Sequence, residues 1–265
     1  MSRRVHHPRA PWAVAALAVA AVIFLALPLL GLLARVPWSK IPSVLAQPSA
    51  LDALRLSLTA SLAATGIALL VGVPLAWILA RVQFPGRGLV RGLVLLPLVL
   101  PPVVGGAALL FALGRSGLLG APLYGATGLV LPFSWWGLVV AVTFVSMPFL
   151  VITAEAGFRN LDRRYESAAA GLGAGRWAVL IRVTLPLAYP SLLAGAMLTW
   201  ARALGEFGAT ITFAGNLPGK TQTLPLAVFV ALEGGDPAAE VLSLLMVALS
   251  LLVLVALRDR WLRSR

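Results

Sequence analysis

The chain of 265 residues contains no cysteine and only two histidines, His6 and His7, both in a basic N-terminal stretch. Without cysteine there can be no disulfide, no thiolate metal site and no catalytic cysteine. Because both histidines lie in the terminal stretch, we also expect no buried histidine base and no histidine metal cluster. The sequence therefore predicts a chain without a metal ion or other cofactor of its own.

Charged residues are also scarce, at 11% of the chain against 60% for hydrophobic residues. A soluble domain normally carries about a quarter charged residues. Because so few charges cannot cover a solvated surface of ordinary size, we expect a membrane protein. The net charge of +12 would suggest a nucleic-acid partner for a soluble protein. In a membrane protein the distribution of Lys and Arg sets orientation instead, and no nucleic-acid partner is expected.

Long uncharged runs predict the membrane spans, because about 20 apolar residues cross a bilayer as a helix. Glycine and proline interrupt residues 116–133, which we interpret as an outer loop. The predicted fold class is all-α and polytopic, with six transmembrane helices over residues 10–34, 56–80, 92–114, 134–155, 186–213 and 238–257. A cleaved signal peptide is the alternative for the first run, but the run is long and lacks a clear small-residue cleavage site.

Arginine and lysine concentrate on alternate loops between these predicted spans. Most of the 21 basic residues lie before the first span, after the second and fourth spans, and at the C-terminal end. The positive-inside rule then places both termini and the loop after the fourth span in the cytoplasm. We expect a multi-pass protein of the cytoplasmic membrane, with Trp135 and Trp136 anchoring the outer end of the fourth helix.

The stretch AGNLPGKT at residues 214–221 fits a relaxed phosphate-loop pattern. The preceding ATITF, at residues 209–213, is β-branched enough to form the strand that such a loop follows. A phosphate loop delivers its Lys and Thr into the start of a helix, but Pro225 would cut that helix short. The stretch also falls on the outer side, where ATP is absent. A Gly-Asn and Pro-Gly turn is therefore the preferred interpretation.

The loop between the fourth and fifth predicted spans, residues 156–186, has the pattern of two short helices. Asp162 can cap the first helix, and Gly171 and Gly173 allow a break after it. Residues 176–183 form a second, amphipathic piece. Such an element suits docking in a cleft of a partner protein, and a hairpin lying on lipid headgroups is the alternative.

Three parts of this loop follow one another at fixed spacing: ESAA at residues 166–169, Gly173, and VTLP at residues 183–186. The spacing resembles the EAA loop of ABC importer permeases, whose pattern is Glu-Ala-Ala, three residues, Gly, nine residues, Ile, one residue and Leu-Pro. The resemblance implies a short coupling helix seated in a groove of a separate ATPase subunit. It also accounts for a chain without nucleotide motifs of its own.

Two positions depart from this pattern, because Ser167 stands in place of its Glu and Val183 in place of its Ile. Glu166, one residue earlier, is the candidate for the acidic contact. The coupling residues that the resemblance implies are Glu166, Ser167, Ala168, Ala169, Gly173, Val183, Leu185 and Pro186.

Three further stretches, residues 96–120, 147–151 and 201–229, are similar to the molybdate branch of these permeases. GEFGA occurs in sulfate permeases too, whereas TFAGN followed by PGKTQTLPLA is more similar to molybdate permeases. The resemblance covers about residues 50–257. It implies a type I ABC importer permease fold and an importer subunit that carries molybdate or tungstate. A sulfate or thiosulfate permease is the alternative.

The resemblance also implies the organisation and partners of the chain. Residues 1–50 would hold a cytoplasmic tail, the first span and an outer loop, residues 51–258 the permease core, and residues 259–265 a basic cytoplasmic tail. The implied partners are a second copy of the chain, two ATPase subunits that bind ATP and Mg, a solute-binding protein and the lipid bilayer. No catalytic residue and no enzymatic activity are expected in this chain. A secondary carrier working alone is the alternative of another class.

Arg202 and Glu206 are ionisable residues inside the fifth predicted helix, and their spacing of four places them on one face. Such groups at membrane depth tend to face a bundle interior or an aqueous path. Two interpretations stay open: a site on the translocation path, with Arg202 offering charge to an oxyanion, or a structural ion pair. Pro101 and Pro102, together with Pro97, interrupt the third predicted helix and are candidates for a gate or a fixed kink.

Overall fold

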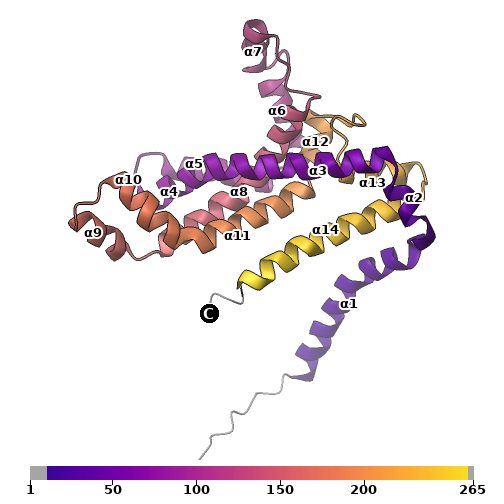
Figure 1. Ribbon diagram of the computed structural model, residues 1–265, viewed down its shortest axis with the longest axis horizontal. Helices are drawn as coiled ribbons and strands as arrows, with labels where there is room; N and C mark the ends of the chain where they lie inside the picture. Colours follow the sequence, from indigo (N-terminus) through magenta and orange to yellow (C-terminus); the bar gives the residue numbers. More distant parts are fainter. Residues whose placement is uncertain (1–10, 262–265) are drawn as a thin grey trace, which may run out of the picture.

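The computed structural model describes residues 11–261, and within that range every regular element is helical (Figure 1). The stretch with His6 and His7, and residues 262–265 of the predicted basic tail, lie outside the described residues. Four helical segments are long and apolar enough to cross a membrane: Trp12–Arg35, Pro48–Arg81, Trp135–Asn160 and Arg176–Leu204. The all-α membrane class is confirmed, and the count of six spans stays a prediction.

The N-terminal helix α1 (Trp12–Arg35) has no buried residue and lies apart from the main bundle, beside α14 (Ala238–Trp261) (Figure 1). Its mean hydropathy of 2.8 suits a helix surrounded by lipid. A short turn, Trp38–Lys40, and α2 (Ile41–Leu45) then lead into the bundle. The segment predicted to be an outer loop therefore contains helical turns.

Two long spans contain a π-helical turn directly before a proline. In the first, α3 (Pro48–Ile67) passes through Ala68–Gly72 into α4 (Val73–Arg81), which has Pro74 in its first turn. Proline lacks the N–H that would bond the carbonyl four residues earlier, and a local π turn accommodates that missing bond.

The second π-helical turn, Leu180–Thr184, joins α10 (Arg176–Val179) to α11 (Leu185–Leu204). The fifth predicted span therefore does not begin at Pro186. It begins at Arg176, because the π turn lets the helix continue through the proline.

The third predicted span is broken into α5 (Arg87–Val99) and α6 (Pro102–Leu113). Leu100 takes an extended conformation, with ψ 134°, as expected for a residue before proline. Pro97 lies inside α5 and does not end it. The break therefore lies at Leu100 and Pro101, and α7 (Gly120–Thr127) occupies part of the region predicted to be an irregular loop.

The fifth predicted span also ends early, because α11 stops at Leu204 and α12 (Gly208–Phe213) forms a separate piece. The ATITF stretch is thus helical and not a strand. After the loop that follows, α13 (Leu224–Glu233) carries Pro225 in its first turn. Pro225 therefore begins a helix, where proline is well tolerated, instead of cutting one short.

Helix α8 (Trp135–Asn160) is the centre of the bundle and packs against α11, α4 and α3. The Ser134 side chain caps it by accepting a hydrogen bond from the Gly137 N–H at 3.1 Å. Figure 1 shows α3, α8 and α11 side by side, with α9 (Arg163–Gly171) and α10 at one end and α13 towards the other. Helices α6, α7 and α12 project to one side of this bundle.

Candidate functional site

Helices α9 and α10 form the helix–glycine–helix element that the sequence predicts. The Asp162 carboxylate caps α9, because its Oδ1 accepts the Arg164 N–H at 2.9 Å. Gly173 has φ +87° and ends the turn after α9, donating its N–H to Ala170 at 3.0 Å. This left-handed conformation suits glycine, which carries no Cβ.

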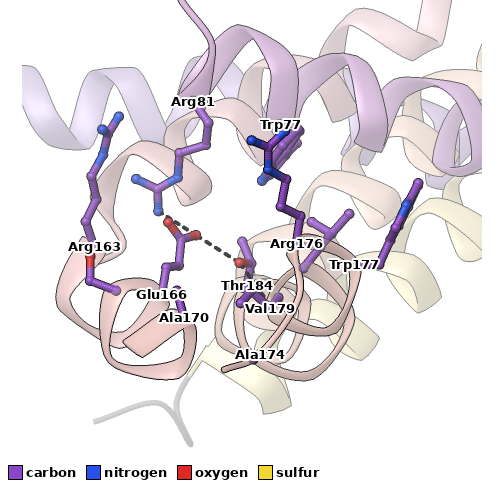
Figure 2. Close-up of a pocket in the computed structure, with 12 residues that line it drawn as sticks. Trp77, Arg81, Arg163, Glu166, Ala170, Ala174, Arg176, Trp177, Val179 and Thr184 are labelled. Atoms are coloured by element: carbon purple, nitrogen blue, oxygen red, sulfur yellow. Dashed lines mark hydrogen bonds and ion pairs between the residues drawn. The ribbon is translucent and has the colours of Figure 1, made fainter. Parts of the chain in front are cut away.

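Glu166 points into its own chain from α9 (Figure 2). Its Oε1 lies 3.2 Å from the Arg81 guanidinium at the end of α4 and accepts a hydrogen bond from the Thr184 hydroxyl at 2.8 Å. Arg81 is also within 3.4 Å of the Leu161 carbonyl, just before α9. The residue predicted to supply an acidic contact is therefore engaged by α4 and by the π turn before α11.

The remaining predicted coupling residues fall into two groups. Ser167, Ala168 and Gly173 are exposed and Ala169 is half-buried, so the tip of the loop is an accessible surface. A Cβ added at Gly173 would meet nothing within 4 Å in this chain. The second group consists of Val183, Leu185 and Pro186, which lie in the continuous helix leading into α11.

A cleft of about 700 Å³ separates the end of α4 from α9 and α10 (Figure 2). Arginine and tryptophan side chains form much of its wall, with Glu166 between them. The lining residues from the three helices are Trp77, Arg81, Arg163, Glu166, Arg176 and Trp177, among others. The cleft lies on the face of the α9–α10 loop that is turned towards the bundle.

Glu155 carries a buried carboxylate that the sequence did not indicate as a site residue. It lies near the end of α8 and pairs with Arg91 of α5, whose Nε is 3.4 Å from Oε2, and with Arg159 at 3.8 Å. The spacing of four between Glu155 and Arg159 was a readable signal. The pairing with Arg91, 64 residues away in sequence, has no comparable sequence signal.

Arg202 and Glu206 form an ion pair, with Nη2 and Oε2 2.6 Å apart. They do not share one helix, because α11 ends at Leu204. The second carboxylate oxygen of Glu206 accepts the N–H of Ala209 at 2.8 Å and so caps α12. The Glu206 side chain is 1% exposed and that of Arg202 is 28% exposed, so only the arginine has access to solvent.

The break between α5 and α6 and the break between α11 and α12 lie against each other. A Cβ added at Gly208 would come within 2.7 Å of the Pro102 Cβ, and one at Gly106 within 2.7 Å of the Thr212 Cβ. These glycines bring α6 and α12 into backbone contact. The structure thus places Pro102, with the neighbouring Pro101, close to the segment that follows Glu206.

The stretch AGNLPGKT is a closed turn. The Thr221 hydroxyl accepts the Leu217 N–H at 3.0 Å, and the Leu217 carbonyl accepts the N–H groups of Lys220, Thr221 and Gln222. Gly215 and Gly219 have φ of +75° and +70°. The N–H groups of Leu217, Lys220, Thr221 and Gln222 are thus used inside the loop, which supports the turn interpretation. Among residues 11–261, no group of three or more His, Asp or Glu could hold a metal ion.

Comparison with known proteins gives matches over most of the chain. Residues 72–264 match the family described as binding-protein-dependent transport system inner membrane component. The molybdenum transport system permease protein ModB of Mycobacterium tuberculosis is 46% identical over 243 residues, 92% of each chain. ModB of Escherichia coli is 43% identical over 206 residues, 77% of this chain and 90% of that one. The sulfate transport system permease protein CysT of Escherichia coli is 37% identical over 239 residues, 89% and 86% of the two chains.

A solved structure shares the fold: a bacterial ABC transporter involved in the import of the acidic polysaccharide alginate, with a TM-score of 0.73 over 96% of both chains and 18% identity. At that identity the likeness shows the fold alone. It agrees with the ABC permease architecture expected from the EAA-like loop. This chain therefore belongs to the family of inner membrane components of binding-protein-dependent transport systems.

Proposed function

We propose that this chain is the transmembrane subunit of an ATP-driven importer that carries molybdate, and also tungstate, across the cytoplasmic membrane. The observation that carries the proposal is the 46% identity to a molybdenum permease over 92% of both chains. Identity to the sulfate permease is lower, at 37%. The TFAGN and PGKTQTLPLA stretches also favour a molybdate permease over a sulfate permease.

The energy source in this proposal is a pair of separate ATPase subunits, which bind ATP and Mg and dock on the tip of the α9–α10 loop. The exposure of Ser167, Ala168 and Gly173 supports this role, as does Leu172, which is 91% exposed. Val183, Leu185 and Pro186 would carry the movement into α11. This chain itself is a transport component and contributes no catalytic residue.

The translocation path would run between two copies of this chain, past the facing breaks at Pro101–Pro102 and at Arg202–Glu206. Arg202 is the residue we propose to meet the anion, since its guanidinium is partly exposed while Glu206 holds it in place. Irregular backbone at membrane depth is tolerated where it faces protein or a water-filled path. A solute-binding protein would deliver the anion at the outer end, with both termini in the cytoplasm.

Reconstitution tests this function directly. Proteoliposomes containing this chain and the ATPase encoded with it should take up molybdate only when ATP is inside and loaded binding protein is outside. The ATPase should also co-purify with the chain. Uptake driven by an ion gradient without any ATPase would instead identify a secondary carrier.

A further inference from the structure

Glu166 lies on the exposed coupling helix, yet its carboxylate is directed at its own chain. Arg81 and Thr184 both contact Oε1, at 3.2 Å and 2.8 Å. The Arg81 side chain is 8% exposed and that of Glu166 is 22% exposed. A pair this far removed from water is screened less than a surface salt bridge.

The three residues come from three segments, and only the Arg81 segment has no direct backbone connection to the α9–α10 loop. Arg81 is the last residue of α4, Glu166 lies in the first turn of α9, and Thr184 ends the π turn before α11. The backbone connects α9 directly to α8 on one side and through α10 to α11 on the other. Helix α4 has no such connection to the loop, so the Arg81–Glu166 pair supplies one.

Arg81 holds α9 at a second point. Its Nη2 lies 3.4 Å from the carbonyl of Leu161, the residue that joins α8 to the capped start of α9. With Glu166 fixed as well, α9 cannot rotate about its own axis without breaking one of these contacts. The surface that carries Ser167 and Ala168 is thereby held in one direction relative to α4.

We propose that Glu166 is a positioning residue that acts through Arg81 and Thr184 and does not itself reach the ATPase. The bridge makes the α3–α4 span move with the coupling loop, in addition to α8 and α11. Movement of an ATPase subunit would then be transmitted to three membrane spans. This inference rests on the proposed function, because it takes the α9–α10 tip to be the ATPase contact.

Charge exchange separates this role from direct contact with the ATPase. Glu166→Gln and Arg81→Met should each insert normally but raise the ATP hydrolysed per molybdate imported by about threefold or more, within the range seen for residues that carry coupling. The exchanged double variant, Glu166→Arg with Arg81→Glu, should restore most of the wild-type ratio. Thr184→Val should give a smaller increase, because it removes one hydrogen bond and leaves the ion pair.

Arg182→Met is the matched control, since Arg182 is exposed in the same π turn and forms no ion pair within residues 11–261. It should keep the wild-type ratio. A readout independent of transport uses the absence of cysteine in the chain. Spin labels at Val82 and Leu172 should give a narrow distance distribution that broadens in Glu166→Gln and narrows again in the exchanged variant.

Two results would overturn the proposal. If Arg81→Met couples like the wild type while Glu166→Gln does not, then Glu166 contacts the ATPase itself. If the exchanged variant inserts but stays uncoupled, the pair does not act as a bridge. Failure of the proposed function is distinguishable, because the wild-type chain would then show no ATP-dependent molybdate uptake at all.

Discussion

Arg202 and Glu206 face each other across the end of α11, 2.6 Å apart, and Glu206 also caps α12 through the Ala209 N–H. The Glu206 carboxylate thus connects α11 to α12 across the break between them. Its side chain is 1% exposed, so the carboxylate is buried against the Arg202 guanidinium and the Ala209 N–H. This arrangement yields a test of whether the pair serves the fold alone or also the path.

Arg202→Met should destabilise the protein by about 3–5 kcal/mol, because it leaves a buried carboxylate without its counter-charge. Arg202→Met with Glu206→Gln should recover most of that loss, since the glutamine oxygen can still accept the Ala209 N–H. Thermal unfolding in detergent measures both effects.

The same double variant tests the path. If Arg202 meets the anion, uptake at low molybdate should fall roughly tenfold, as expected from losing one charge-assisted hydrogen bond worth about 1.5 kcal/mol. Normal uptake by a well-folded double variant would show that Arg202 and Glu206 form a structural pair only.

Gly106 is the contact point between α6 and α12, and we expect it to tolerate no side chain. In Gly106→Ala the new Cβ would lie 2.7 Å from the Thr212 Cβ and 2.9 Å from the Ala209 carbonyl. Overpacking of this kind costs about 1–3 kcal/mol. Gly92→Ala in α5 is the control, because a Cβ there meets nothing within 4 Å. Equal unfolding temperatures for the two variants would contradict the close packing.

The orientation predicted from basic residues can be tested in a chain that lacks cysteine. The α9–α10 loop and the loop before α13 lie towards different ends of the bundle (Figure 1). Cysteine at Leu172, beside Gly173, should react only with reagents that reach the cytoplasm, and cysteine at Lys220 only from outside. Both side chains are exposed in this chain, so without bound ATPase subunits the membrane alone limits access. Labelling of position 172 from outside would reverse the topology.

Substitution of Gly173 should disturb contact with the ATPase subunit and leave the packing of this chain unchanged. Gly173→Asp adds a charged side chain where space in this chain is open, so insertion should persist while ATPase association or coupled hydrolysis is lost. Gly86→Asp is the matched control: Gly86 has φ +82°, close to the +87° of Gly173, and equally open surroundings. The backbone strain is therefore common to both, about 1–2 kcal/mol. Wild-type coupling in Gly173→Asp would mean that this tip does not dock.

Local sequence signals predicted local structure well. The Asp162 side chain caps α9 as predicted, and Gly173 ends the turn after α9, because each of these effects depends on a few neighbouring residues. The proline signals were readable but ambiguous. Pro101 breaks a helix, whereas Pro186 is absorbed by a π turn, and the outcome depends on packing that the sequence does not display.

Long-range pairs could not be predicted in this way. Glu166 is the predicted acidic contact with a separate ATPase subunit, and nothing in the sequence indicates its pairing with Arg81, 85 residues earlier in the chain. Likewise, the sequence indicates no role for Arg91 beyond the positive-inside pattern, whereas the structure pairs it with Glu155. Such pairs depend on which helix ends meet, and hydropathy and charge counts carry no information about that.

Substrate choice gives the last prediction. Molybdate and tungstate are near-isosteric dianions, and a size difference of this kind is worth only about 1–3 kcal/mol even in a tight pocket. A path that offers width and one guanidinium from each copy of the chain should therefore import both in proportion to their loading on the binding protein. Sulfate is smaller and should enter slowly because its delivery is poor. The measurement is uptake into proteoliposomes with the native binding protein, at the molybdate concentration that saturates this protein and at equal concentrations of tungstate and sulfate. Sulfate import at the molybdate rate, with sulfate saturating that binding protein, would replace the molybdate assignment with the sulfate alternative.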